Sequence, residues 1–166
     1  VNVLSKIVIK DENWKPTQTD LKAGTKEEFK DKDGKIVLKR TFNTGESLST
    51  YYVYNNLGNL AYVIPPGVTA TTFTEAVADP SFHQFIYAYR YDGRIRLIEK
   101  KIPGKGWEYL VYNKLDQVIL SQDANQRSHA NQEWAITKYD GQGRPVITGI
   151  YIHTGSTTAT SYRDYF

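Results

Sequence analysis

The chain is built mostly of short segments in which apolar and polar residues alternate or β-branched residues cluster, separated by polar turns rich in Asn, Asp and Gly. This pattern is typical of β-strands joined in hairpins. Because side chains alternate along a strand, Tyr87, Tyr89 and Tyr91 are expected on one face, and Ala88 and Arg90 on the other. The pattern predicts strands at residues 3–10, 26–29, 35–42, 50–54, 59–64, 85–91, 96–102, 107–112, 117–123, 133–139 and 144–152.

An insert at residues 65–85 breaks the strand pattern. Two consecutive prolines at its start lack the N–H groups that a strand ladder needs. Residues 71–78 predict a short helix capped by Thr72 or Thr74, and Asp79 followed by Pro80 predicts another helical turn. We therefore expect an all-β fold of consecutive antiparallel hairpins in a curved open sheet, with a helical insert near residues 72–84. The insert is expected to pack Phe73, Val77 and Phe82 onto the sheet.

One turn motif recurs along the chain. Its clearest copy runs from Tyr139 to Arg144 and reads Tyr-Asp-Gly-Gln-Gly-Arg. Other copies begin at Tyr54, Tyr91 and Tyr112, and a further copy begins at Lys30, with the aromatic residue one position early. The tyrosines are 37, 21 and 27 residues apart (91−54, 112−91 and 139−112). Equal turns with unequal connections favour an array of hairpins over a solenoid of fixed period.

Turn chemistry explains the residues of the motif. Asp or Asn accepts hydrogen bonds from turn amides, Gly supplies a positive φ, Tyr packs across strands, and Arg can lie over a tyrosine ring. The copies keep turn-forming character more often than charge, since Asn113 and Gln117 replace the acid and the base in one copy. A catalytic role would not tolerate that variation. The motif residues are Tyr54, Gly58, Tyr91, Asp92, Arg96, Tyr112, Tyr139, Asp140, Gly143 and Arg144.

The motif resembles the signature of the Rhs/YD-repeat family, aromatic-Asp-x-x-Gly-Arg-Leu. That family includes bacterial wall-associated and secreted Rhs proteins and the animal teneurins. Residues 139–146 match closely, and residues 91–97 match apart from Ile95 in the glycine position. The resemblance extends from about residue 27 to residue 150 and is strongest to Rhs proteins of Bacteroidetes-type bacteria.

The resemblance implies a long β-sheet that spirals into a hollow shell. In bacterial members the shell encloses a C-terminal toxin, whose release depends on an aspartic self-cleavage region. The sequence shows neither that region nor a toxin domain, so we expect an internal piece of wall from a secreted or cell-surface protein. Its partners would be the neighbouring repeats of the parent chain. No catalytic residue and no cofactor is expected.

The composition fits one globular domain over residues 1–166, with the insert at 65–85 and a polar C-terminal tail at 153–166. Hydrophobic residues make up 40% of the chain and charged residues 23%. The chain contains no Cys, which excludes disulfides, Cys-type zinc sites and thiol catalysis. It contains no Met, no signal peptide and no apolar run of about 18 residues, so we expect a fragment without membrane insertion.

The charge pattern disfavours nucleic acid as a partner. The net charge is only +3, and acidic residues lie beside basic ones in stretches such as residues 26–28 and 30–33. A nucleic-acid-binding protein would more often carry a patch of one sign.

Other candidate chemistry is weak. His83, His129 and His153 lack the spacing of metal ligands, so no metal site is expected. Glu99 and Glu108 flank one connection, but a glycosidase needs its two carboxyl groups about 5–10 Å apart in a cleft. We therefore expect no enzymatic activity.

The aromatic residues support one alternative function. Trp107, Trp134 and Tyr109 could form an exposed platform that binds carbohydrate or another protein. The competing interpretation, which we favour, is that the aromatic residues fill the packed face of the sheet. A segment with open sheet edges is also expected to self-associate.

Overall fold

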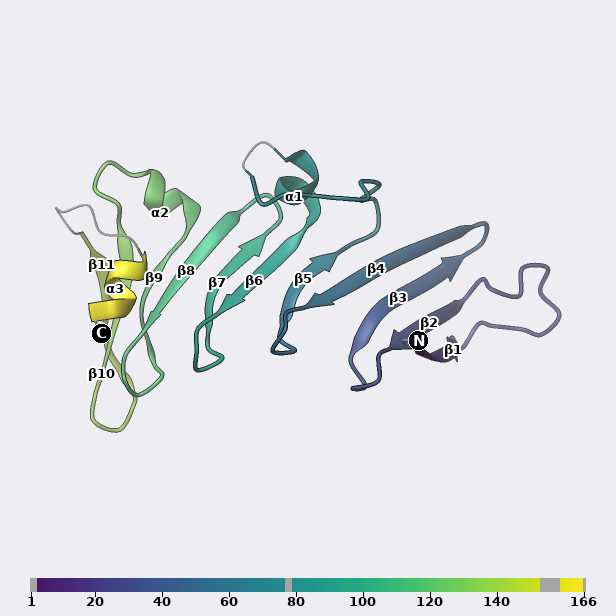
Figure 1. The fold of residues 1–166 in the computed structure, drawn as a ribbon, viewed down its shortest axis with the longest axis horizontal. Helices are drawn as coiled ribbons and strands as arrows, with labels where there is room; N and C mark the ends of the chain where they lie inside the picture. Colours follow the sequence, from purple (N-terminus) through teal and green to yellow (C-terminus); the bar gives the residue numbers. More distant parts are fainter. Residues whose placement is uncertain (1–2, 77–78, 153–158, 166) are drawn as a thin grey trace. The chain divides into compact units, whose positions relative to one another are not determined.

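The computed structural model of the chain describes residues 3–76, 79–152 and 159–165. It divides into two compact units, Val1–Ile86 and Tyr87–Phe166. The predicted fold class is confirmed: the described residues form eleven strands and three short helices, and the strands follow one another in chain order as antiparallel hairpins of an open sheet (Figure 1).

The first unit contains five strands, each antiparallel to the next. They are β1 (Ser5–Lys10), β2 (Thr25–Lys30), β3 (Ile36–Asn43), β4 (Glu46–Tyr54) and β5 (Leu60–Ile64). Strand β4 begins four residues before the predicted start at residue 50 (50−46), because Asn43 pairs with Glu46 across a tight turn. Gly45 in that turn has a φ of 72°, which favours glycine. Strand β1 is exposed along its whole length.

The insert holds one helix, α1 (Pro80–Phe85), capped by Asp79 with Pro80 at its first position, as predicted. The helix predicted at residues 71–78 is wrong for the described residues 71–76, and Val77 lies outside the described residues. One carboxylate oxygen of Asp79 accepts from the amide of Thr74 at 2.8 Å, which folds this segment back onto the cap. Phe82 is buried and stacks on Phe73, whose ring contacts Tyr62 of β5.

The second unit contains six strands and two helices. The strands are β6 (Tyr87–Tyr91), β7 (Leu97–Ile102), β8 (Gly106–Tyr112), β9 (Val118–Gln122), β10 (Trp134–Tyr139) and β11 (Pro145–Tyr151). Each strand is antiparallel to its neighbour in sequence. The helices are α2 (Ala124–Ser128) and α3 (Ala159–Tyr165).

Both helices of the second unit correct the sequence prediction. The segment between the predicted strands at 117–123 and 133–139, for which no helix is predicted, contains α2, which begins with a capping box formed by Asp123 and Gln126. The C-terminal tail at residues 153–166 is predicted to be polar, but α3 within it buries Ala159 and Tyr162. His153 and the rest of residues 153–158 lie outside the described residues.

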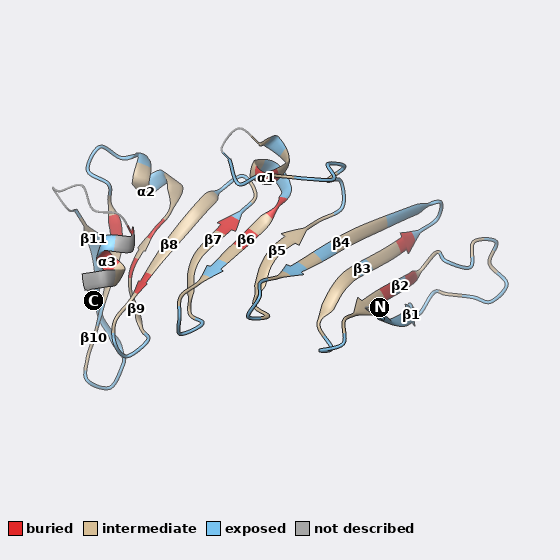
Figure 2. Ribbon diagram, viewed as in Figure 1, coloured by how far each residue is buried: buried red, intermediate tan, exposed pale blue. Residues whose placement is uncertain are grey.

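The core of the second unit lies on the sheet face that α3 covers. Val111, Leu120 and Trp134 are buried there with the buried residues of α3 (Figure 2). Ala88 pairs with Lys101, and Lys101 pairs with Trp107, which lies on the same face of β8 as Val111. Ala88 therefore lies on the core face, and it is only 1% exposed.

The predicted packing of the aromatic residues is therefore right in one place and wrong in another. Trp134 is a core residue, as favoured. Tyr87, Tyr89 and Tyr91 lie on the opposite face from Ala88 and are only half-buried. The face that carries the alternating tyrosines is thus not the packed one.

Candidate functional site

The recurrent motif forms the same turn five times. In each copy the first turn residue accepts hydrogen bonds from the amides two and four residues later, at 2.9–3.1 Å. Only one side-chain oxygen is needed for both bonds, so Asp and Asn are interchangeable. The first turn residues are Asp31, Asn55, Asp92, Asn113 and Asp140.

The fourth turn residue always adopts a left-handed conformation. Gly34, Gly58 and Gly143 have φ values of 78°, 79° and 80°. Ile95 and Asp116 occupy the same place with φ values of 64° and 61°. The strand register shifts where each turn begins, which is the geometry of a type I turn followed by a bulge. The turn geometry therefore persists without glycine.

The motif tyrosines join neighbouring hairpins. The hydroxyls of Tyr54, Tyr112 and Tyr139 each donate at 2.9 Å to a backbone carbonyl of the preceding hairpin. If the first turn residue is counted as residue 1 of each motif, the acceptor is always the sixth residue of the preceding motif, namely Ile36, Leu97 or Val118. We call this contact the tyrosine staple. Sequence reasoning missed it, because the motif predicts only cross-strand packing for the ring.

The staple crosses a gap between two neighbouring hairpins, near their turns, where the strands are no longer paired. We call this gap the splay. In each case the last paired residue before the splay lies three positions before the tyrosine, at Tyr51, Tyr109 and Ile136. Beyond that pair the ladder between the two hairpins stops. The tyrosine hydroxyl therefore replaces ladder hydrogen bonds at the hairpin tips, and it does so in the same register three times.

In three motifs, the fifth residue by the same count reaches the next turn. Lys35 Nζ lies 5.5 Å from the ring centre of Tyr54 and fills the space where a side chain at Gly58 would begin. Arg96 lies 4.8 Å above Tyr112, and its Nη1 is 2.8 Å from the carboxylate of Asp116. Gln117 Nε2 would be 3.2 Å from a β-carbon at Gly143. We call this contact of the fifth residue with the next fourth residue the turn latch.

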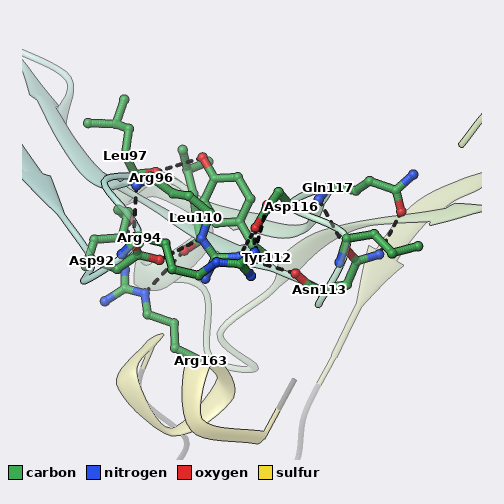
Figure 3. A network of polar contacts seen from close by, with 12 residues as sticks. Asp92, Arg94, Arg96, Leu97, Leu110, Tyr112, Asn113, Asp116, Gln117 and Arg163 are labelled. Carbon is green, nitrogen blue, oxygen red and sulfur yellow. Dashed lines mark hydrogen bonds and ion pairs between the residues drawn. The ribbon is translucent and has the colours of Figure 1, made fainter.

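The latch at Arg96 is the most charged cluster of the second unit's turns (Figure 3). Arg96 Nε donates to Asp92 at 2.7 Å, and Arg94 also pairs with Asp116 at 3.0 Å. Burial acts against the charged form of Asp92, but hydrogen bonds from the backbone and side chain of Arg96 outweigh it and lower the pKa of Asp92. The carboxylates of Asp92 and Asp116 are thus paired with the guanidinium groups of Arg94 and Arg96 within the cluster.

Helix α3 is fixed to the sheet by an arginine. Arg163 Nη1 lies 3.0 Å from Glu99, and its other nitrogens donate to the carbonyls of Ile98 and Leu110 at 2.8 and 3.2 Å. Figure 3 shows Arg163 reaching from the helix toward Leu110. The ring of Tyr162 meets Trp134 edge to face at 5.1 Å. These contacts join residues more than 25 positions apart, which no local pattern predicts.

The aromatic platform considered as an alternative is not an open surface. Trp134 is 2% exposed and forms part of the core. Arg90 lies 4.5 Å above the ring of Trp107, and Arg127 lies 4.2 Å above that of Tyr109. Arg127 also donates to the carbonyl of Trp107. One face of each of the two half-exposed rings is therefore covered by the chain's own guanidinium groups.

The remaining candidates for catalysis do not assemble. Glu99 pairs across strands with Tyr109, and Glu108 pairs with Lys100, so the two carboxylates point to opposite faces of the sheet. A glycosidase pair needs both in one cleft. His129 contacts Glu133 at 2.9 Å, and His83 lies in the last turn of α1. Within residues 3–76, 79–152 and 159–165, no three His, Asp or Glu side chains are grouped as for a metal ion.

The splay between β9 and β10 contains a cavity of about 590 Å³. Its walls include Leu115, Ile119, Ile136 and Tyr139, with Asn113 and Gln117 as polar groups. Gln117 is the short, neutral counterpart of Arg96, and its Oε1 accepts from Asn113 at 2.7 Å. The cavity therefore lies in the splay that the Tyr139 staple spans.

Comparisons with known proteins leave the family open. No protein-family model matches the chain, and no curated protein matches it. Among the described residues, no helix has the length and apolar character needed to cross a membrane.

Proposed function

We propose that the chain is a non-catalytic structural segment of an Rhs/YD-type secreted or cell-surface protein. In this proposal it forms part of a β-shell that encloses or displays another domain. The observation that carries the proposal is the repeated join between hairpins. Three staples bind the same position of the preceding motif, and each is accompanied by a turn latch. Such contacts extend a sheet hairpin by hairpin.

The charges of the motif support a structural role. The Nε of Arg96 lies 2.7 Å from a carboxylate oxygen of Asp92, and the Nε of Arg144 lies 2.7 Å from a carboxylate oxygen of Asp140. Each pair closes its own turn, because the same carboxylate also accepts the turn amides. The carboxylates used in this way have little acceptor capacity left for a substrate.

The outer strands support neighbouring repeats as partners. Strands β1 and β11 are exposed, and aliphatic side chains such as Val8 and Ile147 are 51% and 57% exposed. Exposed apolar edge strands pair readily with further strands. In a longer polypeptide they would pair with adjacent hairpins, and in the isolated chain they would promote self-association.

Limited proteolysis of the full-length polypeptide tests the proposal. Replacing Tyr112 and Tyr139 with Phe removes two staples but keeps both rings. If the chain is part of a shell, these changes should open it and make an enclosed segment sensitive to protease. The variant Tyr87→Phe is the control, since the Tyr87 hydroxyl has no bond among the described residues. Equal digestion of both variants and the unaltered protein would argue against a shell.

A second candidate function is binding of carbohydrate or protein by half-buried aromatic rings. The half-buried tyrosine face of β6 favours it, because Tyr87, Tyr89 and Tyr91 lie in a row opposite the core. Burial, with smaller contributions from Tyr87 and Tyr91, raises the pKa of Tyr89. Saturable glycan binding by a monodisperse monomer, lost in Tyr89→Ala without loss of stability, would support this function over the shell.

A further inference from the structure

Strand β11 is an edge whose last motif ends in an unused arginine. Among the described residues, β11 pairs only with β10. The Arg144 side chain is 71% exposed and contacts only Asp140 there. The edge therefore offers backbone groups, aliphatic side chains and a guanidinium group to a partner.

Arg144 is held in the same way as Arg96. In both motifs the arginine Nε donates at 2.7 Å to the carboxylate of the first turn residue. The Nη1 of Arg96 donates to the next hairpin, at 2.8 Å to Asp116 and 3.3 Å to the carbonyl of Asn113, and the guanidinium covers the ring of Tyr112. Arg144 is therefore held like the arginine of a turn latch, but among the described residues no fourth turn residue of a following motif lies against it.

The type of residue that would contact Arg144 can be inferred from the other latches. Lys35 and Gln117 each approach a glycine as the next fourth turn residue, namely Gly58 and Gly143. Arg96 is the exception, and there the fourth residue is Asp116, which keeps φ at 61° despite its side chain. In the one complete latch that contains an arginine, the partner at the fourth turn position is therefore a carboxylate, which pairs with the guanidinium by charge and hydrogen bond.

We propose that the β11 edge binds a hairpin that carries Tyr directly before its turn and a carboxylate as the fourth turn residue. The carboxylate pairs with Arg144, the tyrosine ring lies beneath its guanidinium, and the tyrosine hydroxyl donates to the carbonyl of Pro145. Pro145 is the sixth residue of its motif, as Ile36, Leu97 and Val118 are of theirs. This inference rests on the proposed function and names the partner at that edge.

The register of the other joins supports the same partner. Ladders between hairpins begin at the eighth residue of a motif, at Leu38, Glu99 and Leu120. The eighth residue here is Ile147, two positions beyond Pro145, so the missing N–H of the proline lies in the splay and costs no ladder bond. The partner residue opposite Ile147 should be large and apolar, as Tyr51, Tyr109 and Ile136 are.

A peptide with the sequence of residues 106–122 is a suitable probe, because it contains Tyr109, Tyr112, Asn113 and Asp116. It should be backbone-cyclised, since an isolated hairpin is marginally stable. Titration of the intact protein, followed by NMR, should shift β11 amides in a saturable manner. Arg144→Glu should weaken this binding about tenfold or more, a factor that corresponds to about 1.4 kcal/mol.

A charge exchange makes the test specific. A probe with Asp116→Arg should bind the Arg144→Glu protein and restore most of the lost affinity. Lys114→Glu in the protein is the control, because it makes the same charge change at an exposed turn position away from β11.

Three outcomes would overturn the inference, and none of them alone removes the proposed function. Failure of both probes to shift β11 would show that the edge does not accept this hairpin. Binding at β11 that is indifferent to the charge exchange would exclude the carboxylate. Occupation of β11 by a second copy of the chain, seen as concentration-dependent shifts without probe, would identify a different partner. The proteolysis of staple variants tests the scaffold separately.

Discussion

At the scale of single residues, the turns separate what the motif requires from what it tolerates. The first turn residue needs one acceptor oxygen, which Asn and Asp both supply. The fourth residue needs a left-handed backbone, and here the chain departs from glycine twice. These departures allow direct tests of backbone strain against side-chain contacts.

Ile95→Gly should stabilise the protein by about 1 kcal/mol. A β-branched residue at a φ of 64° is strained, and the Ile95 side chain is 59% exposed, so little packing is lost. Urea unfolding of the two proteins measures the difference. Asp116→Gly is the matched comparison, because it relieves the same strain but also removes the ion pairs with Arg94 and Arg96. A loss of stability in Ile95→Gly would show that the isoleucine makes a necessary contact.

Gly143→Ala should destabilise the protein by about 1–2 kcal/mol. The new β-carbon would have a φ of 80° and would lie 3.2 Å from Gln117 Nε2. Gly34→Ala has the same backbone strain without a close neighbour, so the difference between the two isolates the latch contact. Gly141→Ala is the control, since Gly141 has neither a positive φ nor a neighbour within 4 Å. Equal melting temperatures for all three variants would contradict the turn assignment.

The acidic turns should make stability depend on pH in the acid range. Hydrogen bonds from the backbone and then the side chain of Arg144 lower the pKa of Asp140. A carboxylate with a lowered folded pKa stabilises the protein above its unfolded pKa of about 4, and this stabilisation is lost as the pH falls through the folded value. Asp140→Asn keeps the acceptor oxygen, as in the turn at Asn113, and should reduce the loss of stability below about pH 4. Urea midpoints from pH 2 to 7 provide the measurement, and an unchanged acid dependence would count against this role.

At the scale of elements, local sequence predicts the hairpins and misses what joins them. The turns were predictable because hydrogen bonds within a few residues determine them, as around Asp140. Helix α2 could have been found from the Asp123–Gln126 capping box. The staples could not, because Tyr139 and Val118 are 21 positions apart. The helix expected at residues 71–78 fails because Asp79 binds the amide of Thr74 from outside the segment.

Helix α3 should depend on Tyr162. The side chain is buried against Trp134, so Tyr162→Ala should cost about 3 kcal/mol and expose the indole. Near-ultraviolet circular dichroism and a red shift of tryptophan fluorescence would report the change. Thr148→Ala is the control, because Thr148 lies exposed on β11 of the same unit. Unchanged fluorescence in Tyr162→Ala would mean that α3 does not close the core.

At the scale of the whole molecule, the fold class follows from the sequence, and the partner surfaces do not. Alternation and turns were enough to predict consecutive antiparallel hairpins. They did not show which face is packed, since α3 covers the face of Ala88 and Trp134 from a distant part of the chain. In the described residues, the repeated polar side chains join one hairpin to the next through the staples and latches.

Native-state hydrogen exchange tests that central claim most directly. If the tyrosine staple joins hairpins, Tyr112→Phe should lose one hydrogen bond of about 1 kcal/mol, and the β8 amides paired with β7 should exchange about fivefold faster. Tyr87→Phe, in the same unit, should leave those rates unchanged. Equal rates in both variants would contradict the claim that the staples hold the hairpins together.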